Sequence, residues 1–238
     1  MVRPTHDAAR CLARFGIDGI GMAFDWGLVG QSIPLLAVGL LMTLRICGLA
    51  ILFGTALGAL LGLASLSGLA PLRWAVRIYV DFIRGTPLLI QIFLVYFALP
   101  VIGLSLSEFW AGVIALSLNA AAFIAEIVRA GIGSIERGQS EAARSIGMRH
   151  AQVLVHILLP QSLRAVVPPI TNELITLVKG SALLSVISVY ELTRAGQGII
   201  AVRFAPLEIF LLISLFYYVT ISLLAWLSRW LEHRLPTW

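Results

Sequence analysis

Long apolar stretches separated by short polar segments run through most of this chain. The first begins near Ile33 and continues into a charge-free region at residues 46–72. Four further apolar runs cover residues 87–107, 109–125, 165–189 and 209–228. Because a helix needs about 20 apolar residues to cross the hydrocarbon core of a membrane, the pattern predicts an all-α, polytopic bundle of about five transmembrane helices.

Glycines mark one face of the first predicted helix. Gly54, Gly58 and Gly62 follow one another at four-residue spacing, so they share a face on which a neighbouring helix can approach closely. The polar segment at residues 65–86 is predicted to be a loop, in which Asp81 and Arg84 form an ion pair at the level of the lipid headgroups. A close helix pair is therefore expected ahead of a polar connection.

The pattern divides the chain into three parts. Residues 1–28 mix charged and apolar positions without a spanning run, which predicts a peripheral tail. Residues 29–234 form the membrane domain, and residues 137–160 within it form a polar element between two spans. The tail has no continuous apolar core, so a cleavable signal peptide is not predicted.

The polar element is predicted to be two short helices joined at a corner. Gln139 and Ser140 are candidate N-caps, and Glu141 falls in the first turn, where the helix dipole favours an acid. Gly147 can adopt a left-handed backbone without a steric penalty and so ends the first helix. Pro160 is predicted to end the second helix.

An apolar ridge flanked by charges follows from this arrangement. It consists of Ala142, Ala143, Ile146 and Met148. A helix with such a ridge can lie in a groove on another protein. The alternative is an amphipathic segment that rests on lipid headgroups.

Composition strengthens the membrane assignment. Only 12% of the 238 residues are charged and the mean hydropathy is +0.96, whereas soluble domains carry about a quarter charged residues. The net charge of +5 comes from arginines between the predicted spans, so nucleic-acid binding is not predicted. With the N-terminus outside, ten arginines fall inside against five outside, which predicts a cytoplasmic polar element and C-terminus.

The sequence predicts no catalytic residues, no metal site and no bound cofactor. A P-loop requires Gly-x-x-x-x-Gly-Lys followed by Ser or Thr, but the sole lysine, Lys179, follows Val178. The four histidines form no ligand cluster with cysteines or carboxylates, and the two cysteines lie far apart.

Polar residues within the predicted spans are candidates for a transport path. Asn119 and Glu126 lie seven residues apart and share a helix face. Glu126 can instead form an ion pair with Arg129 one turn later. Asn119 is therefore the better candidate of the two.

A second group of candidates interrupts the fourth apolar run. It consists of Asn172, Glu173, Thr176 and Lys179. A charge exposed to lipid costs at least ~2.5 kcal/mol, so each charged member must face a cavity or a partner group. These residues could line the route of a zwitterion, or they could form structural hydrogen bonds at a subunit interface.

Five segments in order carry a family resemblance: residues 79–91 (YVDFIRGTPLLIQ), 116–129 (LSLNAAAFIAEIVR), 138–148 (GQSEAARSIGM), 159–164 (LPQSLR) and 189–194 (VYELTR). Together they resemble the permease subunits of polar amino-acid ABC importers of the histidine, glutamine and cystine type. The third resembles the EAA loop of that family. One departure is Lys179-Gly-Ser-Ala-Leu183, where the family commonly has an acid at the position of Gly180.

The resemblance implies a type I ABC importer membrane domain in a bacterial inner membrane. Its expected coupling residues are Gly138, Glu141, Ala142, Ala143, Gly147 and Met148. Its expected partners are a dimeric ATP-binding cassette ATPase that carries ATP and Mg, a second permease subunit (self or paralogue), an extracytoplasmic solute-binding protein, membrane lipid and a polar amino acid. An opine or an osmolyte is an alternative solute, and an ion-coupled secondary transporter is the alternative class.

Overall fold

The structure is a computed structural model that describes residues 24–232, with side chains described through Trp230. Most of the predicted tail, residues 1–23, lies outside the described residues, and the first helix already begins at Trp26. The boundaries proposed at residues 28 and 234 stay predictions. Within residues 24–232 the regular secondary structure consists of helices, joined by short turns, without strands.

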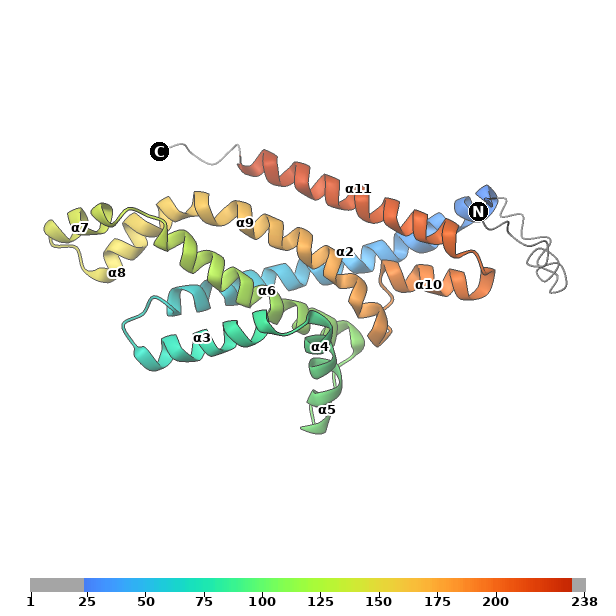
Figure 1. Cartoon of the computed structure of the whole chain (residues 1–238), viewed down its shortest axis with the longest axis horizontal. Helices are drawn as coiled ribbons and strands as arrows, with labels where there is room; N and C mark the ends of the chain where they lie inside the picture. Colours follow the sequence, from blue (N-terminus) through green and yellow to red (C-terminus); the bar gives the residue numbers. More distant parts are fainter. Residues whose placement is uncertain (1–23, 233–238) are drawn as a thin grey trace, which may run out of the picture.

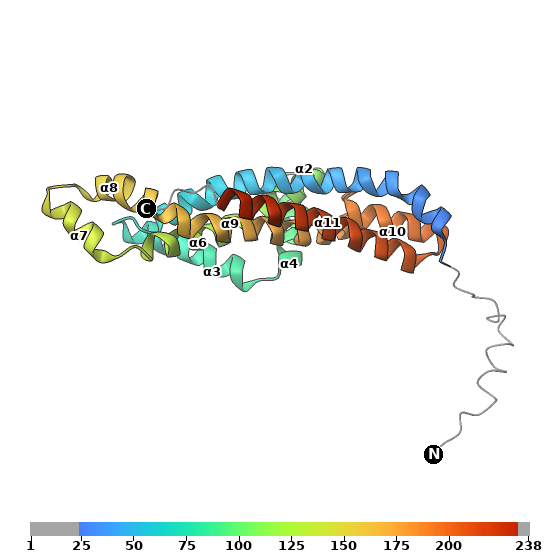
Figure 2. The same ribbon diagram turned by 90° about the horizontal axis from the view of Figure 1, so that it is seen from above.

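The helices form an elongated bundle in which α2, α6, α9 and α11 run along the long axis (Figures 1 and 2). The elements are α2 (Trp26–Ala64), α3 (Ala70–Gly85), α4 (Leu88–Phe93), η1 (Leu94–Ala98), α5 (Leu99–Val101), α6 (Glu108–Gly133), α7 (Arg137–Ser145), α8 (His150–Val153), η2 (Leu154–Leu158), α9 (Leu159–Gly180), η3 (Ser181–Ile187), α10 (Leu192–Arg203) and α11 (Pro206–Glu232).

The prediction of an all-α bundle with about five spans is confirmed. Four helical segments of the described chain are long and apolar enough to cross a membrane: 26–64, 108–133, 150–187 and 206–230. The number rises to five when α3 and the segment from α4 to α5, which are bent by 111° relative to each other, are counted as one bent span. The beginning of α2 and the end of α11 lie at opposite ends of the bundle (Figure 1).

The predicted loop at residues 65–86 is wrong, because most of it forms α3. Val76, Val80 and Ile83 are buried against the rest of the bundle, and their spacing is the helical i, i+4, i+7 pattern. Arginines on the other faces lower the average hydropathy and hid this period. The helix is amphipathic, so it carries both a packed face and a charged face.

The predicted ion pair between Asp81 and Arg84 is also wrong. Asp81 instead lies 3.6 Å from Nε of Arg77, one turn earlier on the same helix. The guanidinium of Arg84 lies 5.6 Å from the ring centroid of Phe123 on α6. Arg84 therefore contacts an aromatic ring of the neighbouring helix.

Pro160 does not end a helix, contrary to the prediction. The helical chain continues from α8 through the short π-helix η2 into α9, with Pro160 in the first turn of α9. Pro100 follows the short π-helix η1 in the same way. In an α-helix a proline ring clashes with the carbonyl four residues earlier. In both cases here that carbonyl lies within the π-helical segment, where the wider helix relieves the clash.

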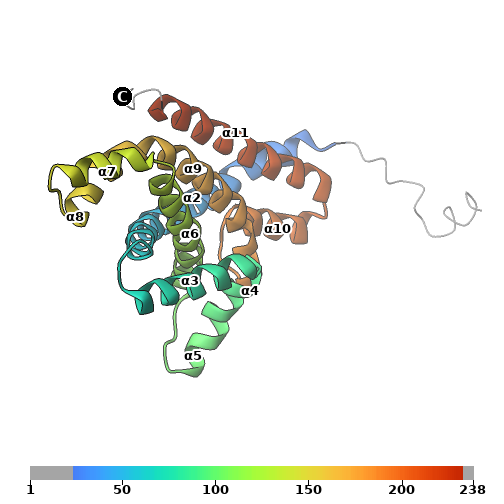
Figure 3. The same ribbon diagram turned by 60° about the vertical axis from the view of Figure 1, so that its left-hand side comes forward.

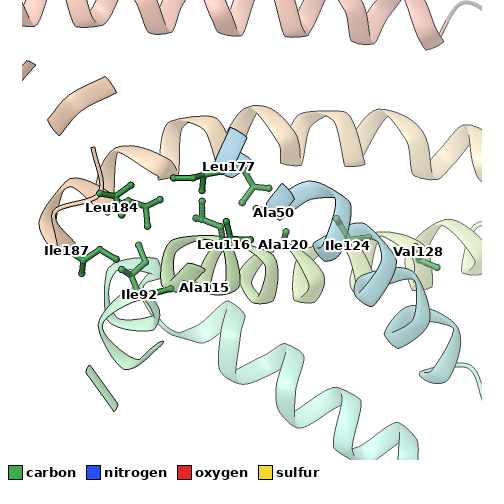
Figure 4. Close-up of a cluster of buried hydrophobic side chains, with 14 of the residues drawn as sticks. Ala50, Ile92, Ala115, Leu116, Ala120, Ile124, Val128, Leu177, Leu184 and Ile187 are labelled. Atoms are coloured by element: carbon green, nitrogen blue, oxygen red, sulfur yellow. The ribbon is translucent and has the colours of Figure 1, made fainter. Parts of the chain in front are cut away.

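The centre of the fold is the close packing of α2 against α6. A Cβ atom built on Gly58 would lie 2.7 Å from Cβ of Ile124 and 2.8 Å from the carbonyl oxygen of Ala121. Gly54 and Gly62 meet α6 at similar distances, so the predicted glycine face is confirmed. Figure 4 shows the core that surrounds this contact. Its labelled residues are Ala50, Ile92, Ala115, Leu116, Ala120, Ile124, Val128, Leu177, Leu184 and Ile187.

A buried carboxylate joins the helices at the end of the bundle opposite α7. Glu191 is fully buried and caps α10, accepting hydrogen bonds from the backbone N–H of Thr193 (2.9 Å) and of Arg194 (2.6 Å). The hydroxyl of Tyr217 on α11 donates to the same carboxylate at 3.1 Å. Burial raises the pKa of the Glu191 carboxyl, although these hydrogen bonds act in the opposite direction.

Candidate functional site

The polar element forms a separate pair of short helices at one end of the bundle. Helices α7 and α8 lie beyond the end of α6, beside the start of α9 (Figures 1 and 3). Most of their residues are exposed. The element therefore presents its surface outside the packed membrane bundle.

The corner between the two helices is fixed by backbone hydrogen bonds. The N–H of Gly147 donates to the carbonyl of Arg144 at 2.9 Å, and the N–H of Met148 donates to the carbonyl of Ala143 at 3.2 Å. This pair of bonds is the Schellman motif, which requires a left-handed residue after the helix. Gly147 has φ 86°, so its predicted conformation is confirmed.

A side-chain contact braces the same corner. Nη2 of Arg144, near the end of α7, lies 3.2 Å from Nδ1 of His150 at the start of α8. The side chain of Gln152 accepts a hydrogen bond from the N–H of Arg149 at 2.8 Å, which caps α8. The two helices are thus held at a defined angle by backbone and side-chain bonds together.

The predicted start of the first helix is wrong. Helix α7 begins at Arg137 with Glu136 as its N-cap residue. Ser140 is already inside the helix, where its hydroxyl donates to the carbonyl of Arg137 at 2.8 Å. Glu141 consequently lies beyond the first turn, and the dipole argument for an acid at this position does not hold.

The exposed surface of the element differs slightly from the predicted ridge. Gly138, Glu141 and Ala142 are exposed and Met148 is half-buried. Ala143, in contrast, is buried, so it packs within the element. Ile146 is 80% exposed. It is part of the predicted ridge but not of the predicted coupling residues. Its apolar side chain at the corner is the sequence signal that could have added it to them.

Three of the predicted path residues share the exposed face of α9. Asn172, Thr176 and Lys179 are exposed along it, at a helical spacing of four and three residues. The hydroxyl of Thr176 donates to the carbonyl of Asn172 at 3.1 Å. These residues form a polar strip, which we call the α9 strip, on a helix that is otherwise apolar enough to cross a membrane.

Two other path candidates point into the subunit. Glu173 is buried, with 8% of its surface exposed. Asn119 is buried as well, and its amide donates to the side-chain oxygen of Gln91 on α4 at 2.9 Å. The amide of Gln91 in turn donates to the carbonyl of Ile83 at 2.7 Å. This network holds the bend between α3 and α4, which favours a structural role for Asn119.

Glu126 forms the ion pair that the structural alternative predicted. The Nε of Arg129 donates to a carboxylate oxygen of Glu126 at 2.9 Å, and a second guanidinium nitrogen contacts the other oxygen. Both side chains are partly exposed. The sequence placed Glu126 and Asn119 on one face, but the structure gives them different partners.

Among the described side chains, residues 24–230, no group of three or more histidine, cysteine or acidic residues could hold a metal ion. The polar groups of the described chain gather in the α7–α8 element, in the α9 strip and along α3. These arrangements can bind a partner or line a path for a polar solute.

Comparison with known proteins gives a consistent result across most of the chain. Residues 54–236 match a protein family described as binding-protein-dependent transport system inner membrane component. The arginine transport system permease protein ArtQ of Bacillus subtilis (strain 168) is 38% identical over 217 residues, which cover 91% of this chain and 99% of the relative. The glutamine transport system permease protein GlnP of Escherichia coli (strain K12) is 38% identical over 216 residues, which cover 90% and 99%.

Solved structures agree with the fold. A crystal structure described as an amino acid ABC transporter with histidines is 37% identical in sequence. It superposes with a TM-score of 0.85 over 90% of this chain and 100% of the matched chain. An inward-facing structure of the MetNI methionine ABC transporter is 24% identical, with a TM-score of 0.74 over 85% of this chain and 97% of the matched chain. At that identity the likeness concerns the fold alone.

Proposed function

The chain belongs to the family of binding-protein-dependent transport system inner membrane components, and from this membership we propose that it is the permease subunit of an ATP-driven importer of a polar amino acid. It is a multi-pass membrane protein and a transport subunit. In the proposed assembly it contacts a dimeric ATP-binding cassette ATPase, which binds ATP and Mg. A second permease subunit and an extracytoplasmic solute-binding protein complete the complex.

The observation that carries the proposal is the α7–α8 element. It lies beyond the ends of the spanning helices, is largely exposed, and is braced internally by the Gly147 corner and the contact between Arg144 and His150. An apolar side chain at its corner, Ile146, is 80% exposed. A rigid, exposed helix pair with an apolar tip suits a groove on a partner subunit.

Rigidity matters for the proposed mechanism. Closure of an ATPase dimer can move the spans only if the contact transmits displacement without bending. Helix α8 continues through η2 into α9 without a loop, so a push on the corner reaches a spanning helix directly. The α9 strip lies on that same helix, which links the proposed ATPase contact to the proposed solute path.

The α9 strip supports a second permease subunit. Lys179 is exposed on a spanning helix, and a charge there would cost at least ~2.5 kcal/mol if it faced lipid. A second permease, either this chain or a paralogue, would cover the strip and enclose a polar path. Asn172, Thr176 and Lys179 would then contact the solute, whereas Asn119 and Glu173 would support the helices from inside.

The proposed orientation places the N-terminus outside and the C-terminus and α7–α8 in the cytoplasm. Arg137, Arg144 and Arg149 of the α7–α8 element then lie on the cytoplasmic side, against Arg194 and Arg203 of α10 outside, as the positive-inside rule predicts. The ends of α2 and α6 and the start of α9 lie on the α7 side of the bundle (Figures 1 and 2). This orientation gives the polar element access to cytoplasmic ATPase subunits.

A polar amino acid is the proposed solute because the relatives ArtQ and GlnP are named as permeases for arginine and for glutamine. A zwitterion also matches a strip that combines an ammonium group with neutral hydrogen-bonding groups. Lys179 is followed by Gly180 and preceded by Val178, so its immediate neighbours in the sequence carry no charge. An opine or an osmolyte is the alternative solute.

The test is affinity purification of this chain from its native membranes in mild detergent, followed by mass spectrometry. Recovery of a P-loop ATPase is expected for the wild type. An Ile146→Asp variant should lose the ATPase, whereas Leu104→Asp, which also replaces an exposed aliphatic side chain by a carboxylate but before α6, should retain it. A chain that purifies alone and still transports solute in proteoliposomes without ATP would overturn the proposal in favour of a secondary transporter.

A further inference from the structure

A charged cavity lies between α3 and α6, apart from the α7–α8 element and the α9 strip. Its volume is about 540 Å³. The lining consists of Ser65, Arg73, Trp74, Val76, Arg77, Val80, Asp81, Arg84, Ala125, Glu126 and Arg129. Four arginines and two acids make the lining net positive, so the cavity suits an anion.

The positive surplus belongs to two particular arginines. Arg77 and Arg129 each have a carboxylate partner within the lining, Asp81 and Glu126 respectively. Arg73 instead donates to the carbonyl of Ser67 at 2.9 Å, and Arg84 lies over the ring of Phe123. Neither has a carboxylate within ion-pair distance among residues 24–230, whose side chains are described. A guanidinium has five N–H donors, so both retain donors for a ligand.

The arginines lie at the seam between two faces of α3. At about 100° per residue, Arg73, Arg77 and Arg84 fall on one line along the helix. On one side of this line lie the buried residues that pack on the bundle, Val76, Val80 and Ile83. On the other side lie Trp74, Ile78 and Phe82, which are 65%, 63% and 54% exposed. The cavity thus adjoins an exposed apolar surface, and Trp74 belongs to both.

One end of the cavity lies at the depth of one membrane surface, and Arg84, beside Phe123 on α6, marks its deeper end. Arg129 is about one turn before the end of the spanning helix α6 at Gly133, and Ser65 directly follows the end of α2. Tryptophan and arginine are typical of the interface between hydrocarbon and headgroups. Basic pockets between spanning helices bind anionic lipid headgroups.

We propose that this cavity binds the phosphate headgroup of an anionic phospholipid, with Arg73 and Arg84 as the main headgroup contacts and an acyl chain along Trp74, Ile78 and Phe82. The apolar surface favours a lipid over a free anion, because a free anion would gain nothing from it. The inference rests on the membrane location of the chain and not on the proposed solute or the ATPase contact. A failure of either proposal therefore leaves the other testable.

The test uses the assembled transporter in nanodiscs that contain equal parts of phosphatidylglycerol and phosphatidylcholine, and native mass spectrometry of the lipids that stay bound. Wild-type protein should retain phosphatidylglycerol selectively. Loss of two arginine contacts in Arg73→Gln/Arg84→Gln should lower that retention about tenfold. Arg229→Gln is the control, because Arg229 is an exposed arginine on α11 that does not line the cavity, and its retention should match the wild type.

Three results would overturn the proposal. The first is equal retention of the two lipids by wild-type protein, which does not depend on the folding of any variant. The second is displacement of the bound phosphatidylglycerol by millimolar inorganic phosphate, which would assign the site to a free anion. The third is unchanged lipid retention in the double variant together with an increased KM for the transported amino acid, which would assign the cavity to the solute path.

Discussion

The contact between α2 and α6 and the α7–α8 element use glycine for opposite purposes. In the first, glycines remove side chains so that two helices meet at backbone distance, and a Cβ on Gly58 would lie within 2.8 Å of a carbonyl oxygen. In the second, no atom lies within 4 Å of the Cβ position of Gly147, but its backbone has φ 86°. One glycine is required by space and the other by conformation.

This difference separates a packed core contact from an exposed element, which we propose to be the contact with the ATPase. The α2–α6 contact belongs to a core whose members are almost fully buried, so a substitution there should affect folding. The α7–α8 element is exposed and is held by its own hydrogen bonds. A substitution there should affect coupling while the bundle stays intact.

The largest expected effect is on the α2–α6 contact. Gly58→Ala should destabilise the protein by about 1–3 kcal/mol, because the new methyl group overlaps a carbonyl oxygen that cannot move away. Gly48→Ala on the same helix is the control, since nothing lies within 4 Å of its Cβ position. Alanine is the better helix former, so this variant should gain up to about 1 kcal/mol.

Thermal unfolding of the purified protein in detergent measures both variants. Opposite shifts of the melting temperature are expected. Equal shifts in the same direction would contradict the close contact between α2 and α6.

The next effect concerns the corner of the α7–α8 element. Gly147→Ala forces an L-residue into the left-handed region at about 1–2 kcal/mol, which should open the corner and lower solute-stimulated ATPase activity about tenfold. Asn tolerates this backbone better than Ala, so Gly147→Asn should lose less activity. The measurement is ATP hydrolysis by the reconstituted complex, with and without solute.

Gly133→Ala serves as the control for this series. Gly133 ends α6 close to the element, its Cβ position is open and its φ is not in the left-handed region. Its ATPase activity and melting temperature should match the wild type. Normal coupling in Gly147→Ala would show that the corner does not transmit the motion.

The sequence predicted those features that depend on short-range rules. Runs of about 20 apolar residues located the spans, and the four-residue spacing of Gly54, Gly58 and Gly62 predicted a close helix contact. The left-handed conformation of Gly147 followed from its position after a polar helix. Each of these signals is local and has one dominant physical cause.

Features that depend on partners across the fold could not be predicted in this way. Helix α3 was missed because its arginines masked an amphipathic period. The continuation of the helix through Pro160 depends on the π-helical segment before it. Asn119 and Glu126 share a face in sequence, yet one bonds to Gln91 and the other to Arg129. Ala143 was predicted to be exposed but packs inside the element.

Two acidic helix caps differ in the same way, one in a buried region and one in an exposed region. Glu191 caps α10 in a fully buried site with three hydrogen-bond donors, while Glu136 caps α7 at an exposed site without a side-chain capping bond. Glu191→Gln should change the free energy of unfolding by about 1 kcal/mol at neutral pH. Glu136→Gln should leave it unchanged.

The pH dependence gives an independent readout for Glu191. Burial raises its pKa in the folded protein above the ordinary value of 4.5, so the fold favours the protonated form and the wild type should lose stability as pH rises from about that value through the folded pKa. Glu191→Gln cannot titrate and should show a flatter profile, measured as melting temperature between acidic and neutral pH. Parallel profiles for the two proteins would contradict the raised pKa.

The smallest expected effect decides between the two interpretations of Glu126. Its ion pair with Arg129 is partly exposed, so Glu126→Gln should lower stability by only about 0.5 kcal/mol, and less at high salt. Asp81→Asn removes the more exposed pair with Arg77 and should have a still smaller effect. If Glu126 is structural, transport by both variants should match the wild type in KM for the amino acid. An increased KM in Glu126→Gln alone would place this carboxylate on the solute path and extend that path from the α9 strip to α6.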